Sequence, residues 1–259
     1  MTQLNDGVIA LVSIGMHPAS GRARRAMQDA RAVELGLRLA GPGLGLLHAG
    51  DPSQDVLRDY LGMGVRRLQV MSMPPDADAL PALVEHLAST GVQLLLTGTR
   101  AETGEGSGML PFLLAERLGW PLLSGLVEVE RIEAGVAQVL QALPRGQRRR
   151  LRVRLPFVAS VDDAAPAPRQ SAFGPARRGH IELIGSTATI DAVLAQHPLR
   201  SARPRPKRLK LVKASNAAER MKLATAKARG GGGQVLTGLT PQAGAEAILK
   251  LLSDEGLLR

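Results

Sequence analysis

Short apolar runs alternate with stretches of helical spacing over the first 118 residues. Each run is short, largely apolar and bounded by turn residues, which is typical of a buried strand. In the stretches between, apolar residues recur every three or four positions, which predicts helices. The expected strands are residues 8–14, 44–47, 67–71 and 92–97, and the expected helices are 27–39, 54–61, 77–88 and 109–118. This alternation predicts an α/β fold, a doubly wound and mainly parallel sheet with helices on both faces.

The pattern changes after Pro121, where short strands separated by turns replace the strand–helix alternation. The expected strands are residues 122–127, 128–132, 136–143 and 151–161, followed by a loop at 162–168 and a short helix at 190–197. Residues 1–199 are therefore expected to form one α/β domain with a β-rich second half.

Residues 200–259 lack this dense patterning and are expected to form a basic, extended arm with a C-terminal helix that packs on or docks to partners. Residues 201–213 are basic and interrupted by Pro204 and Pro206, which predicts extended chain. An amphipathic helix is expected at 217–229, a four-glycine hinge at 230–233, and a last helix at 241–252 with Thr240 as its N-cap.

Composition narrows the possible chemistry. The chain has no cysteine, which excludes disulfides, thiolate metal sites and a cysteine nucleophile. The five histidines show no metal-ligand spacing, and no catalytic motif is found. We therefore expect a binding or carrier subunit and no enzyme. No apolar run reaches membrane-spanning length and no signal peptide is evident, so we expect a cytoplasmic protein.

Charge is unevenly distributed along the chain. The net charge of +10 divides into −4 up to Pro144 and +14 from Arg145 onward. Such asymmetry fits an acidic partner, a nucleic acid or an anionic surface, and it equally fits a solvated face of an arginine-rich protein. The chain has one Trp, one Tyr and three Phe, so it offers few platforms on which the bases of a nucleic acid could stack.

The fourth expected strand leads into a glycine-rich loop at residues 98–108, directly before a helix. In open α/β sheets ligands bind outside the carboxyl ends of strands, and glycines let backbone amides approach an anion. The loop has neither the lysine of a Walker A motif nor a GxGxxG spacing. Glu102 and Glu105 would repel a phosphate if they pointed inward. The loop is the best candidate phosphate site, with a flexible crossover loop as the alternative.

One segment of the chain ends in Leu-Gly-Trp-Pro at residues 118–121, and another has the Pro-Arg pair at 168–169. They belong to a series of segments at residues 8–14, 27–39, 49–52, 61–64, 94–101, 104–105, 111, 115–121, 155–159, 168–169 and 176–182. In this order the segments resemble the β subunit of electron transfer flavoproteins.

The resemblance implies a Rossmann-like core similar to adenine-nucleotide-binding domains, paired as a heterodimer with an α subunit that holds most of an FAD. It implies AMP in this chain, or a second FAD in the electron-bifurcating class. Electrons would arrive from a flavoprotein dehydrogenase, here one of amine or betaine catabolism, and leave to a membrane quinone oxidoreductase.

The resemblance also places the nucleotide site residue by residue. The carrier class has a polar Asp-Asn-Gln-Thr run where this chain has mostly glycine, so backbone amides would hold the phosphate. The expected cofactor-binding residues are Ser13, Asp29, Ala49, Gly50, Gly98, Arg100, Gly104, Glu105, Gly106, Ser107, Gly108 and Met109.

Partner docking is expected in the arm, with Met221 or Leu223 as the apolar anchor for the dehydrogenase. The alternative is that both pack against this chain or the α subunit. Two other functions stay open: a stand-alone adenine-nucleotide-binding regulatory domain of the same fold, and a nucleic-acid binder that uses the basic arm.

Overall fold

The computed structural model describes residues 7–104, 106–197, 216–219, 221 and 236–254. By its internal contacts the chain divides into two units, residues 1–199 and 200–259, and each is described by itself.

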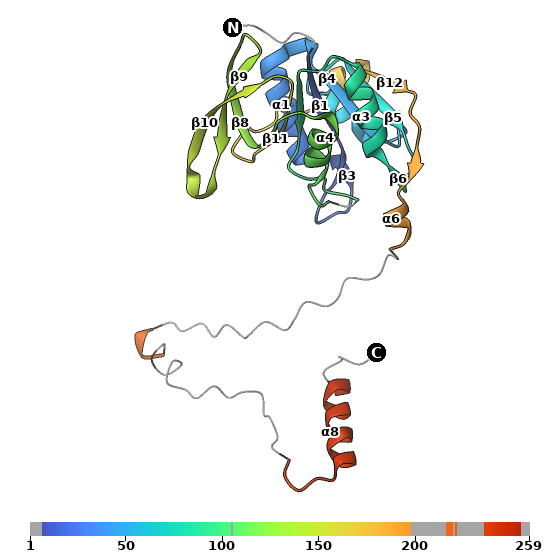
Figure 1. The fold of residues 1–259 in the computed structure, drawn as a ribbon, viewed down its shortest axis with the longest axis vertical. Helices are drawn as coiled ribbons and strands as arrows, with labels where there is room; N and C mark the ends of the chain where they lie inside the picture. The colour runs from blue at the N-terminus through green and yellow to red at the C-terminus, as the bar shows by residue number, and fades with distance from the viewer. Residues whose placement is uncertain (1–6, 105, 198–215, 220, 222–235, 255–259) are drawn as a thin grey trace. The chain divides into compact units, whose positions relative to one another are not determined.

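A nine-stranded sheet forms the centre of residues 1–199 (Figure 1). Its strand order is β10-β9-β8-β11-β7-β1-β4-β5-β12, and all neighbours are parallel except the β8–β9 and β9–β10 pairs. The strands are β1 (Val8–Leu11), β4 (Gly45–Gly50), β5 (Arg67–Ser72), β7 (Leu94–Thr97), β8 (Leu122–Glu133), β9 (Val136–Ala142), β10 (Arg148–Arg154), β11 (Phe157–Val161) and β12 (His180–Ile184). The predicted mainly parallel α/β sheet is confirmed.

Helices cover both faces of the parallel strands (Figure 1). Alternate residues of β1 point to opposite faces, since Val8 and Ala10 join one core cluster while Ile9 and Leu11 join the other. The first cluster contains apolar residues of α1 (Met27–Ala40) and α2 (Arg58–Leu61), and the second those of α3 (Ala79–Ser89) and α4 (Leu110–Leu118). This is the doubly wound arrangement that the sequence predicts.

The strand expected at residues 8–14 is divided in the structure, and the prediction of one strand is wrong. The strand β1 ends at Leu11, and a separate hairpin pairs β2 (Ile14–Met16) with β3 (Ala23–Arg25). The division occurs because both the amide and the hydroxyl of Ser13 bind the carboxylate of Asp29 rather than a neighbouring strand.

The β-rich segment also differs from the prediction. Residues 122–132 lie in one long strand, β8, whose irregular register keeps Leu126, Val129 and Ile132 buried. The strand expected at 151–161 is instead two strands. Antiparallel pairing of β10 stops at Arg154, and Pro156 has no amide hydrogen to continue a ladder. The chain then enters the parallel sheet as β11.

Shorter elements complete this unit. The helix expected at 54–61 is a 3-10 turn, η2 (Asp55–Leu57), followed by α2. The helix expected at 190–197 is reduced to α6 (Ala192–Ala195), because β13 (Thr189–Ile190) pairs with β6 (Ala77–Asp78). Sequence reasoning missed α5 (Phe173–Arg178) and the sheet-edge strand β12, because both are short and only partly apolar.

In residues 200–259 the structure describes one long helix, α8 (Pro241–Asp254). The hydroxyl of Thr240 accepts a hydrogen bond from the amide of Ala243 at 3.3 Å, so the predicted N-cap is confirmed. None of the α8 side chains is buried. The segments predicted at 201–213 and 230–233, most of 217–229, and Leu223 lie outside the described residues.

Within the described ranges, no helix is both long enough and apolar enough to cross a membrane.

Tyr60 gives a test of how the first helix is attached to the sheet. Its fully buried hydroxyl donates to the carbonyl of Ser13 at 2.7 Å and accepts from the amide of Ala26 at 2.8 Å. Tyr60→Phe removes the side-chain partner of the buried amide of Ala26 and of the part-buried carbonyl of Ser13, so we expect a loss of about 1–3 kcal/mol in the free energy of unfolding. Urea unfolding followed by circular dichroism measures it.

The control is Ser89→Ala, which removes an exposed hydroxyl that donates to His86. This change should cost less than about 0.5 kcal/mol. Equal losses in the two variants would contradict the role given to Tyr60.

Candidate functional site

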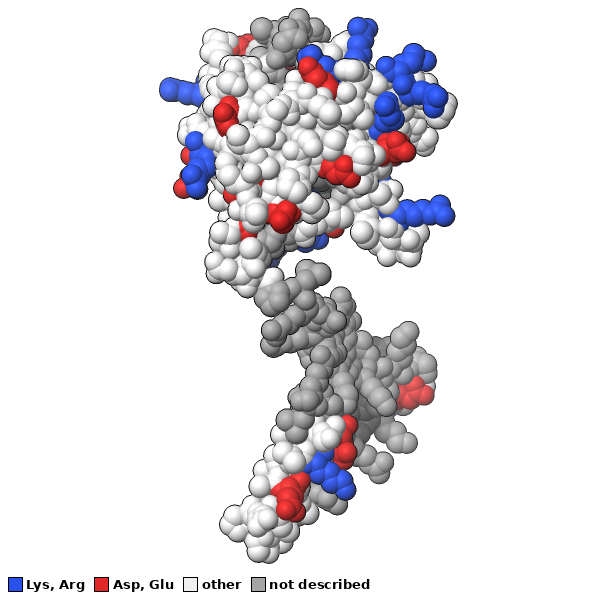
Figure 2. Space-filling model, turned by 90° about the vertical axis from the view of Figure 1, so that its right-hand side faces the viewer, with Lys and Arg blue, Asp and Glu red and all other residues white. Residues whose placement is uncertain are grey.

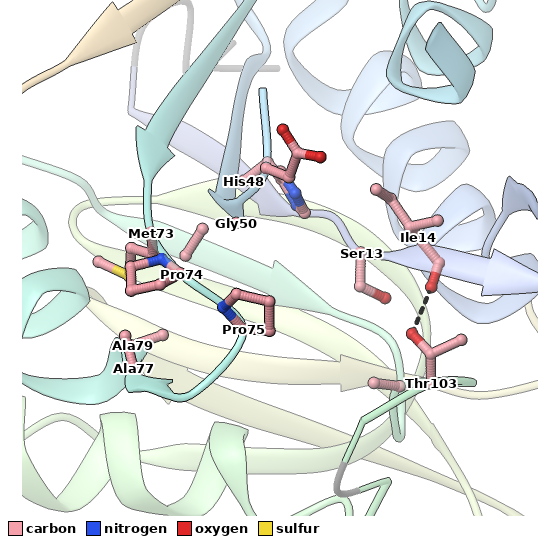
Figure 3. A pocket seen from close by; sticks show the side chains of 13 residues that line it. Ser13, Ile14, His48, Gly50, Met73, Pro74, Pro75, Ala77, Ala79 and Thr103 are labelled. Carbon is pink, nitrogen blue, oxygen red and sulfur yellow. Dashed lines mark hydrogen bonds between the residues drawn. The ribbon is translucent and has the colours of Figure 1, made fainter. Parts of the chain in front are cut away.

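An open pocket of about 330 Å³ lies at the carboxyl edge of the sheet (Figure 3). The chain proceeds from β1 outward to β4 and β5, and then returns to place β7 on the other side of β1. The order of the strands therefore reverses at β1, and ligands of doubly wound sheets bind at such reversal points.

The pocket walls are small and mostly apolar. They come from the chain after β1, the end of β4, the chain after β5, the start of α3 and the loop after β7. The residues that line the pocket are Ser13, Ile14, His48, Ala49, Gly50, Asp51, Met73, Pro74, Pro75, Ala77, Ala79, Ala101 and Thr103. Neither Lys nor Arg is among these residues, and Asp51 contributes a negative charge, so the walls suit an uncharged group such as a nucleobase better than a polyphosphate.

The carboxylate of Asp29 joins the two strands at the reversal point. It accepts hydrogen bonds from the amide of Ser13 at 2.7 Å, the hydroxyl of Ser13 at 2.5 Å and the amide of Gly98 at 3.1 Å. Ser13 follows β1 and Gly98 follows β7, so one side chain of α1 fixes both strand ends. A Cβ atom at position 98 would overlap this carboxylate, which explains the glycine.

Burial raises the pKa of Asp29 to about 6, although the hydrogen bonds from Ser13 and Gly98 act to lower it and the charge of Glu102 adds to the rise. Asp29 is only 5% exposed and does not line the pocket. It therefore supports the pocket wall through Ser13, whereas the family resemblance predicts that it binds the cofactor directly.

Glu102 points away from the pocket. Its carboxylate accepts hydrogen bonds from the amide of Met27 at 2.8 Å, the amide of Met16 at 3.1 Å and the guanidinium of Arg24 at 3.0 Å. Gly15 makes room for it, since a Cβ there would come within 2.5 Å of the carboxylate. Glu102 thus satisfies the first turn of α1 and anchors the β2–β3 hairpin, so this charge does not face a ligand.

The loop after β7 folds back over the pocket. The hydroxyl of Thr103 donates to the carbonyl of Ile14 at 2.7 Å, which fixes the loop beside the end of β1 (Figure 3). Gly104, Gly106 and Gly108 then adopt left-handed backbone angles, with φ of 71°, 60° and 76°. Left-handed residues at alternate positions favour backbone amides that converge on an anion.

The structure brings together some of the predicted cofactor-binding residues and separates others. Ser13, Ala49 and Gly50 line the pocket, and Asp29 and Gly98 lie beneath it. The remaining residues of the loop continue from the pocket toward α4 without lining it: Arg100, Gly104, Gly106, Ser107, Gly108 and Met109. In this stretch the hydroxyl of Ser107 accepts from the amide of Met109 at 3.2 Å. Glu105 lies outside the described residues.

Sequence reasoning missed His48 in the pocket wall. It is 5% exposed, and its Nδ1 lies 2.8 Å from the carbonyl oxygen of Val12, so Nδ1 carries the hydrogen. Burial lowers the pKa of His48, and the ring is neutral at pH 7. The only available signal was its place at the end of an apolar strand, next to Ala49. The apolar wall that follows β5, Met73 to Pro75, was missed as well.

A second buried carboxylate, Glu34, lies on α1 away from the pocket. It receives hydrogen bonds from Arg169 at 2.7 Å and from Arg38 at 2.9 Å. Burial alone would raise the pKa of Glu34, but these bonds outweigh it and lower the pKa to about 2. Arg169 thereby ties the chain between β11 and α5 to the first helix.

Comparisons with known proteins bear on this site. A family model described as the electron transfer flavoprotein domain matches residues 20–188. An electron transfer flavoprotein subunit beta of Chromohalobacter salexigens is 60% identical over 255 residues, 97% of this chain and 96% of the relative. YgcR of Escherichia coli, provisionally named as an electron transfer flavoprotein subunit, is 32% identical over 155 residues, 54% of this chain and 58% of the relative. The family match includes Asp29 and the whole loop after β7.

The titration of Asp29 gives a pH test of the site. Its pKa is about 6 in the folded chain against an ordinary value of 3.8, so the folded state holds the proton more tightly. The stability that this proton provides is lost as pH rises from about 4 to about 6. We expect the free energy of unfolding of the native chain, relative to Asp29→Asn, to fall across this window and to stay level above it.

Urea unfolding at half-unit steps from pH 4 to pH 7.5 measures this difference. Glu34 acts in a different window, since its lowered pKa adds stability as pH rises from about 2 to about 4.5, and it does so in both proteins. If the difference in the free energy of unfolding between the native chain and Asp29→Asn does not change from pH 4 to pH 6, the raised pKa of Asp29 is contradicted.

Proposed function

This chain belongs to the electron transfer flavoprotein beta subunit family, and we propose that it pairs with an α subunit to form a heterodimeric electron carrier. The α subunit would hold most of a redox-active FAD. Electrons would enter from a flavoprotein dehydrogenase, of amine or betaine catabolism, and leave to a membrane quinone oxidoreductase. The bacterial cytoplasm is the proposed location.

We propose that the pocket at the carboxyl edge holds AMP. The observation that carries this proposal is an apolar pocket at the strand-order reversal, beside a loop of left-handed glycines. The pocket offers a flat space for adenine at Ser13, Ala49 and Gly50. The loop offers backbone amides to a single phosphate. No Lys or Arg side chain lines the pocket. A second FAD in place of AMP would instead indicate the bifurcating class.

A stand-alone regulatory nucleotide-binding domain is the weaker alternative. Such a domain would end near the fourth parallel strand and its helix, whereas the family match continues to residue 188 and includes β8 to β12.

Two segments of the chain are candidates for docking the dehydrogenase, the arm and the helix α5. Met221 is 69% exposed, and Leu223, two positions later in the sequence, lies outside the described residues. Phe173 on α5 is 80% exposed, and Arg177 and Arg178 occupy the last turn of the same helix. An exposed aromatic side chain with neighbouring cations suits transient docking to an acidic protein surface. We propose that the arm is the docking segment, and Phe173 is the alternative anchor.

Gly106→Val tests the loop in the assembled complex. A β-branched residue at φ of 60° is strained by about 1–3 kcal/mol, so the loop should change shape. We expect Gly106→Val to assemble with the α subunit and keep its flavin, while the affinity for AMP falls at least tenfold by calorimetry on nucleotide-stripped complex.

The matched control is Gly91→Val. Gly91 has φ of 66° and lies before β7, at the other end of the sheet. The complex that contains Gly91→Val should bind AMP with the affinity of the native complex, although the backbone strain is similar. Unchanged AMP affinity in Gly106→Val would refute the loop assignment, and failure of the native chain to assemble with an α subunit would refute the function itself.

Leu223→Ala and Phe173→Ala separate the two docking candidates. The variant that removes the true anchor should raise the KM of the dehydrogenase for the complex about tenfold, because the contact acts in docking and not in chemistry. Steady-state reduction of the complex measures it. The arm is not the docking segment if Leu223→Ala prevents assembly with the α subunit. The same holds if Phe173→Ala raises KM while neither Leu223→Ala nor Met221→Ala does.

A further inference from the structure

The pocket at the carboxyl edge of the sheet has four side chains in its wall that form strong hydrogen bonds: Ser13, His48, Asp51 and Thr103. A hydroxyl or a neutral imidazole can both donate and accept a hydrogen bond, so three of the four could present either character to a ligand. The structure decides which character each presents, because a hydrogen that is already bound within the protein is not available to a ligand.

Both hydroxyls of the wall have used their hydrogen. The hydroxyl of Ser13 donates to the carboxylate of Asp29 at 2.5 Å. Burial raises the pKa of Asp29 to about 6, so at pH 7.5 this carboxylate is ionised and can only accept. The hydroxyl of Thr103 donates to the carbonyl of Ile14 at 2.7 Å (Figure 3). From a ligand, therefore, each of the two oxygen atoms can only accept a hydrogen bond.

His48 and Asp51 are acceptors as well. The one N–H of neutral His48 is at Nδ1, 2.8 Å from the carbonyl oxygen of Val12. Its Nε2 carries a lone pair, is buried and has no hydrogen-bond partner among the described residues. Asp51 accepts from the side chain of Gln54 at 2.9 Å, which lowers the pKa of Asp51, so its carboxylate is ionised at neutral pH. Neither side chain has a hydrogen to offer.

The backbone that follows β5 is also poor in donors. Pro74 and Pro75 have no amide hydrogen. The amide of Met73 donates to the carbonyl of Gly50 at 3.1 Å. The amide of Ala77 donates to the carbonyl of Pro74 at 3.1 Å. On this side, too, the described wall gives a ligand few hydrogens to accept.

A wall of acceptors separates ligands by the hydrogens that they carry. An amino group can donate to such a wall, whereas a carbonyl oxygen in the same place meets lone pairs with no hydrogen between them and is repelled. Adenine has an amino group where hypoxanthine has a carbonyl oxygen, and the two bases are close in shape. The pattern of the wall therefore favours adenine.

Charge does not make this distinction. AMP and IMP carry the same phosphate, so a basic group attracts both alike. Neither Lys nor Arg is among the described residues that line the pocket. On the face drawn in Figure 2, most of the described basic side chains lie at the margins of a broad uncharged area. Selection between the two nucleotides thus depends on the hydrogen bonds of the wall.

We propose that this wall selects the base by its amino group, with Ser13 as the specificity-determining residue, and so favours AMP over IMP. Ser13 is half-buried, whereas Asp51 is exposed and water can satisfy it, so a mismatch at Ser13 is the more costly. Asp29 is a positioning residue, because it holds the hydroxyl hydrogen of Ser13. The inference rests on the proposed function, which supplies the adenine nucleotide.

The test measures affinities by calorimetry on the nucleotide-stripped heterodimer at pH 7.5. The ligands are AMP, IMP and purine riboside 5′-monophosphate, which has a hydrogen in place of the amino group. Ser13→Ala removes the acceptor. The matched control, Ser89→Ala, removes an exposed hydroxyl that does not line the pocket. Thermal unfolding checks that each variant folds.

We expect the native complex to bind AMP at least tenfold more tightly than IMP, with purine riboside 5′-monophosphate between them. Ser13→Ala should lower the ratio of the AMP and IMP affinities at least threefold, and Ser89→Ala should leave the ratio unchanged. A merely structural role of Ser13 would weaken both nucleotides alike and would not move this ratio.

Three results would overturn the inference while leaving AMP in the pocket: IMP that binds as tightly as AMP, purine riboside 5′-monophosphate that binds more tightly than AMP, or an unchanged ratio in Ser13→Ala. If the native complex binds none of the three nucleotides, the proposed AMP site fails and the inference fails with it. Should Ser13→Ala not fold, the order of the three affinities in the native complex decides.

Discussion

One carboxylate fixes the geometry of the site. Asp29 reaches from the first turn of α1 to the ends of β1 and β7, where it accepts three hydrogen bonds from Ser13 and Gly98. The group is buried at the place where the strand order reverses, so it fixes the backbone that follows each of the two strands. A buried carboxylate without a cation is costly, and its raised pKa of about 6 reflects that cost.

The neighbouring contacts explain why the pocket can be open and nearly uncharged. Tyr60 and Glu102 each satisfy backbone amides at the start of α1, and Thr103 ties the loop to Ile14. These polar side chains shape the backbone around the pocket, and the lining itself is mostly apolar. A site of this kind recognises a ligand by backbone and shape, which fits the AMP that we propose for it.

Local sequence signals predicted the parallel strands β1, β4, β5 and β7, the helices α1, α3 and α4, and the glycine-rich loop. They could not show that Asp29 supports the site from beneath, since the decisive contact with Gly98 joins positions 69 residues apart. His48 was missed for a similar reason, as its partner Val12 is on another strand. The edge strand β12 was not predicted, because only its pairing with β5, more than 100 residues earlier, makes it a strand.

The nucleotide content of the purified heterodimer tests the central claim most directly. The complex is denatured, and the released flavin and adenine nucleotides are separated and counted per heterodimer. The account predicts one FAD and one AMP. Two FAD and no AMP would contradict AMP in this pocket, and a lone chain that releases ATP or no nucleotide would contradict the carrier function.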